Sequence, residues 1–569
     1  MSSNTTSEFD AIVVGSGISG GWAVKELTER GLKVLLVERG PHITHREDYS
    51  GEDKAPWEMP FAGRIPEKEA NRDYFVQKDC YALEGATKKF FVNDRTHQYI
   101  HPKEKPFSWI RGYQLGGRSQ LWARQTYRWS DIDFRANKTD DHGIDWPIRY
   151  KDIAPWYDHV EKFAGISGSL EGLDQLPDGK FLPPMEMNCV EVEAKQKIEK
   201  AFPTRKMIIG RCANLTEPTK EHLELGRGRC QYRNECEKGC SFGASFSSLS
   251  ATLPAAQRTN NLTTVTDAIV HSVTYDNVSK QATGVKIIDA NTKEHRQYFG
   301  RMIFLCASTL GSTQIMLNSI SESFPNGIAN SSGTLGHYLM DHIFMSGARG
   351  EHPGFQKNYY SGRRPNGIYI PRYRNVTEKD DRFLRGYGFQ GGASRPNWRR
   401  GSNMQGIGLE LKEKLREPGS WQFHLGGFGE MLPDKRNRVL LDKNKQDQWG
   451  IPLLNIECEL HDNEFKMLDA MSDDAAAMLS AAGIINIQKY NEAAPPGLAI
   501  HEMGTARMGH NPSSSVLNKF NQTHDVSNLF VTDGSAMTSS ACQNPSLTYM
   551  ALTARASAYA VQLLKEGTI

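Results

Sequence analysis

The sequence predicts a mixed α/β fold, α+β in its second part, from three observations. The run Phe9–Val14 is short, apolar and β-rich, as a buried parallel strand is, and a glycine turn and a helical pattern follow it. A second apolar strand, Val34–Val37, comes directly after that helix. Much later, Trp421 to Leu425 alternates apolar with polar residues, which is typical of a half-buried strand in an antiparallel sheet.

Length and composition are those of a soluble globular protein. A chain of 569 residues, 38% hydrophobic and 24% charged, suggests roughly two to four domains. The net charge of +2 argues against nucleic acid or an anionic membrane surface as a partner. No run approaches the roughly 18 apolar residues of a membrane span, and the first ten residues lack the basic region of a secretion signal.

The glycine turn after the first strand carries the spacing G-x-G-x-x-G. Gly15 permits the tight turn, Gly17 lets the backbone approach a pyrophosphate, and Gly20 lets the helix pack closely on the strand. The helix N-terminus then faces the phosphates, and Glu38 follows about 20 residues later, where it can accept from a ribose hydroxyl. In this strand–turn–helix–strand context we favour a dinucleotide site over a purely structural turn. FAD and NAD share the fingerprint, so it does not choose between them.

Further motifs make the pattern specific. LGGRSQLW occupies residues 115–122, ASTLGS 307–312, GHYLMDH 336–342, HEMGTARMG 501–509, and a strand ending in Asp533-Gly534 precedes Asn544-Pro545 and an alanine-rich helix, Met550 to Leu563. Taken together, the chain resembles the glucose-methanol-choline family of FAD oxidoreductases over nearly its whole length. The branches that it resembles most are bacterial sugar dehydrogenases and pyranose oxidases.

The resemblance implies a Rossmann-like FAD-binding domain interleaved with an antiparallel-sheet substrate domain. We expect residues 1–50, 90–145, 240–345 and 500–569 to form the first, and 51–89, 146–239 and 346–499 the second. Pyranose oxidases bond a histidine covalently to the flavin at the position of Leu121, so noncovalent FAD is expected here. The residues expected to bind FAD are Gly15, Gly17, Ile18, Ser19, Gly20, Glu38, Arg39, Gly116, Gly117, Ser119, Trp122, Val270, Asp533, Gly534, Asn544 and Pro545.

Oxidising an alcohol with a flavin needs a base for the hydroxyl proton and a donor that holds the oxygen. His501 and Asn544 suit these roles, and the resemblance supports them because the family places a His/His or His/Asn pair in these two motifs. An isolated histidine is more often structural, and for His342, in MDHI, we favour packing over catalysis. Gln422 and His424 share the polar face of the 421–425 strand and are expected to contact substrate, with simple solvation as the alternative.

Other segments yield weaker expectations. Val265 to Val273 and Thr283 to Ile288 are predicted strands. The arginine-rich stretch 374–400 has no periodicity, so we interpret it as a solvated loop or lid margin.

Three cysteines, Cys230, Cys236 and Cys240, fall within eleven residues of a polar segment. Free thiols, a disulfide and a zinc site are alternatives, although the paired CxxC spacing of zinc sites is missing. Thiolates also bind iron–sulfur clusters. The spacing resembles that of bacterial FAD glucose dehydrogenases, which implies a three-iron, four-sulfur cluster that receives electrons from the flavin.

The predicted function is a sugar dehydrogenase of the glucoside 3-dehydrogenase type, which passes electrons from a sugar or glycoside to a cytochrome c or a dye. Two alternatives stay open: an oxygen-using pyranose or glycoside 3-oxidase, and a flavin electron-transfer subunit without substrate chemistry. Related dehydrogenases are exported on a small partner with a twin-arginine signal. We therefore expect such a small hitch-hiker subunit and a periplasmic location, with the cytoplasm as the alternative.

Overall fold

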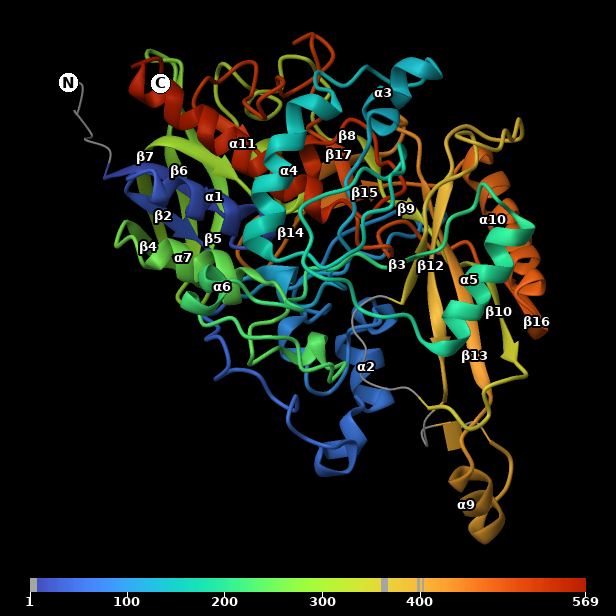
Figure 1. Cartoon of the computed structure of the whole chain (residues 1–569). Coiled ribbons are helices and arrows are strands. Elements are labelled where there is room, and N and C mark those ends of the chain that lie inside the picture. Colours follow the sequence, from blue (N-terminus) through green and yellow to red (C-terminus); the bar gives the residue numbers. More distant parts are fainter. Residues whose placement is uncertain (1–7, 360–366, 397–399, 402–403) are drawn as a thin grey trace.

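The computed structural model describes residues 8–359, 367–396, 400–401 and 404–569. Its first sheet has seven strands, in which β1, β2, β4, β7 and β18 pair in parallel and β5, β6 and β7 pair antiparallel. These strands are β1 (Phe9–Val14), β2 (Val34–Val37), β4 (Leu262–Val265), β5 (Ala268–Asp276), β6 (Gln281–Asp289), β7 (His295–Leu305) and β18 (Leu529–Val531). Segments from both ends of the chain thus build one sheet, which Figure 1 shows at the side of the molecule that holds both termini.

The glycine turn joins β1 to helix α1 (Ile18–Glu29). Gly15 has a φ of +93°, which residues with a side chain rarely adopt. A Cβ on Gly20 would lie 1.8 Å from the Gly15 carbonyl oxygen. These two glycines therefore fix the turn and the close approach of helix and strand. The strand and helix predicted here from the sequence are confirmed.

The second sheet also has seven strands and lies at the far side of the molecule, with α10 (Asp462–Ala481) and α5 (Cys189–Ala201) against its outer face (Figure 1). Its strands are β3 (Ile208–Ile209), β9 (His342–Ile343), β10 (Ser346–His352), β11 (Ile368–Ile370), β12 (Tyr387–Ser394), β13 (Trp421–Glu430) and β16 (Ile485–Asn491). All of its pairings are antiparallel, as predicted.

Alternation along β13 separates the two faces of this sheet. A Cβ on Gly427 would lie 2.5 Å from the sulfur of Met471 in α10, so this residue faces the helix layer. His424 and Gly426 have the opposite parity and line the large cavity between the two sheets. One face of the sheet therefore packs on α10, and the other is presented to the cavity.

A third, four-stranded sheet lies between the other two, in the order β15 (Pro452–Glu457), β14 (Arg438–Gln446), β8 (His337–Met340) and β17 (Met503–Thr505). It brings the segment after β8 and the segment before β17 together in space. These segments carry His342 and His501, which are 159 residues apart in the chain. The strand pairing of β8 with β17 thus sets up the site described below.

Two sequence predictions need correction. The strand predicted over 265–273 is two strands, β4 and β5, because the chain turns at Asp267, which has φ +51°. The stretch 374–400 was predicted to be a loop, but it contains the central strand β12; residues 397–399 lie outside the described residues. The sequence of β12, YGFQGGAS, has glycine where an amphipathic strand has side chains, so its alternation is hidden. Within the described residues, no helix has the length and apolar character needed to cross a membrane.

Candidate active site

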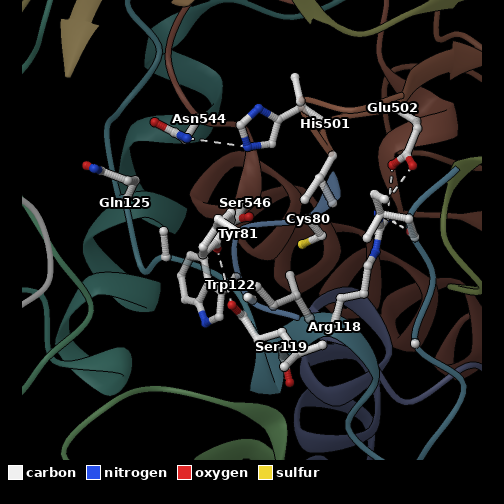
Figure 2. A pocket seen from close by; sticks show the side chains of 18 of the residues that line it. Cys80, Tyr81, Arg118, Ser119, Trp122, Gln125, His501, Glu502, Asn544 and Ser546 are labelled. Carbon is white, nitrogen blue, oxygen red and sulfur yellow. Dashed lines mark hydrogen bonds and ion pairs between the residues drawn. The ribbon is translucent and has the colours of Figure 1, made fainter. Parts of the chain in front are cut away.

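A cavity of about 1230 Å³ runs between the two large sheets, from the turn after β1 to the inner face of β12 and β13. Pockets for drug-sized ligands usually measure about 300–1,000 Å³, so this one has room for a dinucleotide and a small substrate. Figure 2 shows a part of its wall, where Ser119 and Trp122 of the LGGRSQLW element lie near His501 and Asn544, which come from two other segments of the chain.

The glycine turn forms one end of the cavity. Gly17 caps α1 with φ −65°, and a Cβ built on it meets no atom within 4 Å, so its backbone opens directly onto the cavity. The backbone N–H groups at the start of α1 favour an anion at this position. The turn therefore offers the bare backbone and the electrostatics that a pyrophosphate requires.

Glu38 lies beside this turn at the end of β2 and lines the cavity, although it is only 6% exposed. Its carboxylate accepts hydrogen bonds from the backbone N–H groups of Ser16 and Gly40, both at 3.0 Å, and from the Ser16 hydroxyl. Burial raises the pKa of this carboxyl above its usual range. Glu38 thus holds the glycine turn in place as well as facing the expected ribose position.

Arg39 also lines the cavity, but its guanidinium is stacked on aromatic rings. It lies 4.5 Å from the ring centre of Tyr113 and 5.3 Å from that of Trp449, and 3.7 Å from the Asp447 carboxylate. Val270 lines the same region from β5. This end of the cavity thus combines a carboxylate, a stacked cation and an apolar wall.

The LGGRSQLW element crosses the middle of the cavity. Gly116 has φ +87°, and its N–H donates to the Ser16 hydroxyl at 2.8 Å, which ties this loop to the glycine turn. The Trp122 indole N–H donates to the Phe246 carbonyl at 2.9 Å, so its ring is fixed against the cavity wall. The Arg118 guanidinium pairs with the buried Glu502 carboxylate at 2.9 Å, next to His501 in the chain.

His501 and Asn544 meet in the cavity. The Asn544 side-chain nitrogen lies 3.3 Å from Nε2 of His501 (Figure 2). The Asn544 side-chain oxygen accepts a 2.8 Å hydrogen bond from the Gln390 amide. Asn544 directly precedes helix α11 (Ser546–Lys565), and Gln390 lies on β12. Burial, with contributions from His342 and Arg118, lowers the pKa of His501 well below its usual range, so its imidazole is neutral.

His342 and Asp341 lie directly behind His501. Nδ1 of His342 is 3.0 Å from Nδ1 of His501, and Nε2 of His342 is 3.1 Å from the Ser540 carbonyl oxygen. The Asp341 carboxylate accepts backbone N–H bonds from Gly497 at 2.7 Å, Ala499 at 3.2 Å and His501 at 3.0 Å. Burial raises the pKa of Asp341 to about 7. This carboxylate therefore holds the loop that carries His501.

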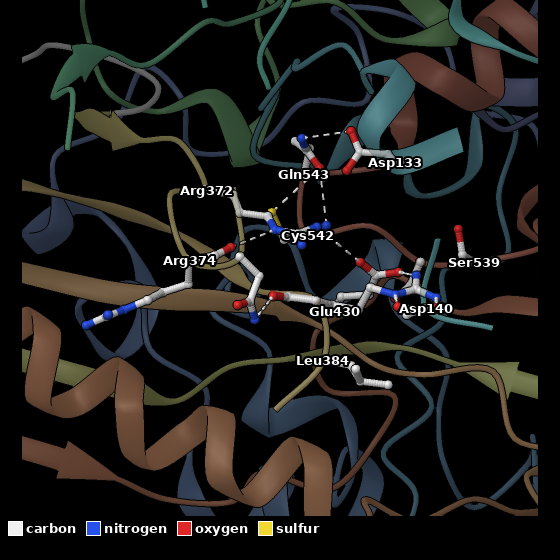
Figure 3. Close-up of polar contacts among 12 residues, drawn as sticks. Asp133, Asp140, Arg372, Arg374, Leu384, Glu430, Ser539, Cys542 and Gln543 are labelled. Carbon is white, nitrogen blue, oxygen red and sulfur yellow. Dashed lines mark hydrogen bonds and ion pairs between the residues drawn. The ribbon is translucent and has the colours of Figure 1, made fainter. Parts of the chain in front are cut away.

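A buried polar network holds the segment before Asn544 (Figure 3). The Gln543 amide donates to the Asp133 carboxylate at 3.2 Å, and burial raises the pKa of Asp133 to about 6. Nearby, Arg385 donates to Glu430 on β13 at 2.5 Å and also pairs with Asp140. The first contact ties the Asn544 segment to the start of α3 (Asp131–Thr139), and the second ties the end of α3 to the second sheet.

Most of the predicted site residues are brought to this one cavity. Those that line it are Gly15, Gly17, Ile18, Ser19, Glu38, Arg39, Gly117, Ser119, Trp122, Val270, His424, His501, Asp533, Gly534 and Asn544. Gly20, Gly116 and Pro545 do not line it; they shape the turns beside it. Gln422 shares the face of His424 and pairs with Ser394, which lines the cavity, but Gln422 itself is not among the lining residues, so its substrate contact stays a prediction.

Sequence reasoning missed several cavity residues on the substrate side. The main ones are Gln125, Gln390, Phe428 and Tyr490. Gln125 follows the LGGRSQLW motif by three residues, so a longer motif window would have included it. Gln390 was missed because Gly388, Gly391 and Gly392 in β12 have no side chains that would show the polarity alternation of a strand.

The geometry of the three clustered cysteines does not support the predicted metal site. All are thiols, and in the described part of the chain no group of three or more His, Cys, Asp or Glu side chains is arranged to hold a metal ion. The Asn214 amide donates to the Cys236 sulfur at 3.8 Å and also bonds to Cys230, whose sulfur accepts from the Tyr232 N–H at 3.5 Å. The predicted iron–sulfur cluster on Cys230, Cys236 and Cys240 is therefore not supported.

Comparison with known families agrees with this geometry. Models of the GMC oxidoreductase family match residues 9–344 and 433–553. The chain belongs to the GMC oxidoreductase family. It is 28% identical over 572 residues to 2-methyl-1,2-propanediol dehydrogenase of Mycolicibacterium austroafricanum, covering 97% of this chain and 94% of that protein. It is 25% identical to the fructose dehydrogenase large subunit of Gluconobacter japonicus, over 99% and 100% of the two chains.

The fold of this GMC oxidoreductase is also that of solved relatives. The formate oxidase of Aspergillus oryzae RIB40 superposes with a TM-score of 0.60 at 13% identity, covering 99% of this chain and 100% of that one. The family resemblance inferred from the motifs is confirmed, and the chain is an oxidoreductase of the type that includes sugar and alcohol dehydrogenases and oxidases.

Proposed function

We propose that this GMC oxidoreductase uses FAD to oxidise a secondary alcohol of a pyranose or glycoside, as a glucoside 3-dehydrogenase does. The observation that carries the proposal is the meeting of His501 Nε2 and the Asn544 amide, 3.3 Å apart, in the cavity that also holds the open glycine turn. A neutral base and an amide donor at one point are what the removal of a hydroxyl proton requires.

The residues that line the cavity fit FAD. Gly17 leaves the backbone bare where phosphates would approach the start of α1, and Glu38 and Val270 line the region expected for the adenosine part. The solved structure of formate oxidase, which shares this fold, is described in terms of FAD modification. When bound, the flavin accepts the hydride from the alcohol carbon.

The residues of the chain handle the proton. Because the His501 imidazole is neutral, its Nε2 can accept the proton of the substrate hydroxyl. The hydride leaves the carbon that bears this hydroxyl. Asn544 has a second N–H that can donate to the alcohol oxygen and stabilise its developing negative charge. Gln390 holds the amide oxygen of Asn544 at 2.8 Å, which directs the amide nitrogen toward His501.

A sugar is supported as the substrate by the far wall of the cavity. His424, Gln390 and Tyr490 supply polar groups there, and Gly426 between them leaves space for a ring. Fructose dehydrogenase and, over 133 residues at 32% identity, a C-glycoside 3-oxidase of Arthrobacter globiformis are among the relatives. Oxidation at the 3-position is the more specific part of this proposal.

The electron acceptor, the small partner subunit, the cytochrome and the periplasmic location stay predictions. Anaerobic mixing with a panel of sugars and alkyl glycosides tests the main proposal: the flavin absorbance should bleach with a pyranoside, and the product should be a 3-keto sugar. No bleaching with any sugar or alcohol would refute it. In a separate aerated sample of the same preparation, peroxide formation compared with dye reduction separates an oxidase from a dehydrogenase, and an iron assay decides the cluster hypothesis.

A further inference from the structure

A second buried imidazole, that of His342, lies behind His501 and away from the substrate. It is 3% exposed, and its ring centre is 4.8 Å from that of His501 at an interplanar angle of 72°. Its Nδ1 faces His501 and its Nε2 faces the Ser540 carbonyl, and the backbone of Ala541 also hydrogen-bonds to the ring. The contacts of both nitrogens are within hydrogen-bond distance, so this ring does more than fill space.

The protons on these contacts can be assigned from their chemistry. A carbonyl oxygen only accepts, so Nε2 of His342 must carry a proton. Burial lowers the pKa of His342 to about 4, so the ring is neutral at ordinary pH and its Nδ1 has a lone pair. Nδ1 of His501 must then be the donor in the 3.0 Å contact. A neutral His501 with a proton on Nδ1 has its lone pair on Nε2, the atom that faces Asn544 and the cavity.

We propose that His342 is a positioning residue that fixes His501 in the tautomer whose Nε2 lone pair faces the substrate hydroxyl. In the other tautomer, His501 would present an N–H to the alcohol oxygen and could not take its proton. The inference rests on the proposed function, because it assigns a task to the base of that reaction.

The acceptor of the His342 proton is itself fixed. The Ser540 hydroxyl donates to the Met431 carbonyl at 2.9 Å, and the Met431 N–H donates back to the hydroxyl at 3.1 Å, so residue 540 is held against the end of β13. The main chain of His501 is fixed as well, because its backbone N–H donates to the Asp341 carboxylate at 3.0 Å. The order from sheet to substrate is therefore Ser540, His342, His501, with each imidazole donating to the group behind it.

Two substitutions of His342 separate positioning from packing. His342→Leu keeps an apolar side chain in the space but removes the acceptor, whereas His342→Asn keeps an oxygen at about the place of Nδ1. We expect His342→Leu to retain FAD and to lower the saturating rate of flavin reduction by sugar about 10- to 100-fold, with the apparent substrate Kd within about threefold. His342→Asn should recover the rate to within about fivefold of the wild type. His352→Leu is the matched control and should reduce normally, because this buried histidine on β10 contacts Glu193 and Phe355 and is not among the residues that line the cavity.

Nitrogen-15 spectra of histidine-labelled holoenzyme give a readout that does not depend on turnover. The signals lost in His501→Ala should be those of a neutral ring protonated at Nδ1, and in His342→Leu they should shift toward a mixture of tautomers. A wild type that no sugar reduces would refute the proposed function and leave this spectral test standing. A rate in His342→Leu within threefold of the wild type, equal rates in the Asn and Leu variants, or an Nε2-protonated His501 would each overturn the positioning role.

Discussion

Gly17→Asp should separate the stability of the fold from its ability to bind FAD. Gly17 caps α1 without a side-chain hydrogen bond, its φ of −65° suits any residue, and the space beyond its Cα is open. Aspartate is a favoured N-cap and its charge complements the helix dipole, so we expect the apoprotein to gain about 0.3–1 kcal/mol. The same carboxylate would face the pyrophosphate of FAD. At about 4 Å and an effective dielectric constant near 20, two unit charges repel by about 4 kcal/mol, or about 10³-fold in Kd.

The assay is the ratio of flavin to protein absorbance after purification, together with thermal unfolding of the apoprotein with and without added FAD. Gly17→Asn is the matched control, because it has nearly the same shape and also caps helices but carries no charge, so it should weaken FAD binding less. Gly20→Ala is the opposite case: its Cβ would lie 1.8 Å from the Gly15 carbonyl oxygen, so the fold itself should be destabilised. A Gly17→Asp protein with a full complement of FAD would refute the placement of the phosphates.

Three further predictions follow from hydrogen bonds of the site. Gln390→Leu frees the Asn544 amide and should slow flavin reduction about tenfold; a stopped-flow rate equal to the wild type would contradict the role given to Gln390. Glu38→Ala should lose FAD during dialysis and about 1–3 kcal/mol of stability, yet reduce normally when resupplied with FAD; full retention would count against it. Burial raises the pKa of Asp341 from its ordinary 3.8 to about 7, so the folded state favours the protonated carboxyl. The free energy of unfolding should therefore fall as the pH rises from about 4 to 7, by up to about 4 kcal/mol from this group. Urea titrations of Asp341→Asn should show a flatter dependence of this free energy on pH, and a dependence equal to that of the wild type would contradict the coupling of Asp341 to folding.

The parts of the fold that follow local rules were predictable from the sequence. Gly15 and Gly20 indicate a strand–turn–helix unit, because only glycine suits the backbone of the turn and the close contact of helix and strand. The strand over 421–425 is predicted by its alternation of apolar and polar residues. Strand β12 was missed because its glycines carry no polarity pattern, and Gln390 was missed with it.

Long-range geometry was harder to predict. The meeting of His501 with Asn544 came from motif resemblance, since 43 residues separate them and no local rule closes that gap. The alternation of polar and apolar residues places Gln422 on the same face of β13 as His424. It does not show which residues of that face line the cavity. The direction of each cysteine sulfur depends on how the loop packs, and spacing in the sequence does not fix it.

Anaerobic stopped-flow reduction of His501→Ala by a sugar that bleaches the wild-type flavin tests the central claim most directly. The claim is that the chain binds FAD in this cavity and that His501 takes the hydroxyl proton of the alcohol. The variant should keep its FAD, since His501 lies at the opposite end of the cavity from the glycine turn, and its flavin should be reduced about 10²-fold or more slowly. A rate within threefold of the wild type in a fully flavinylated variant would remove His501 from the mechanism and contradict the account.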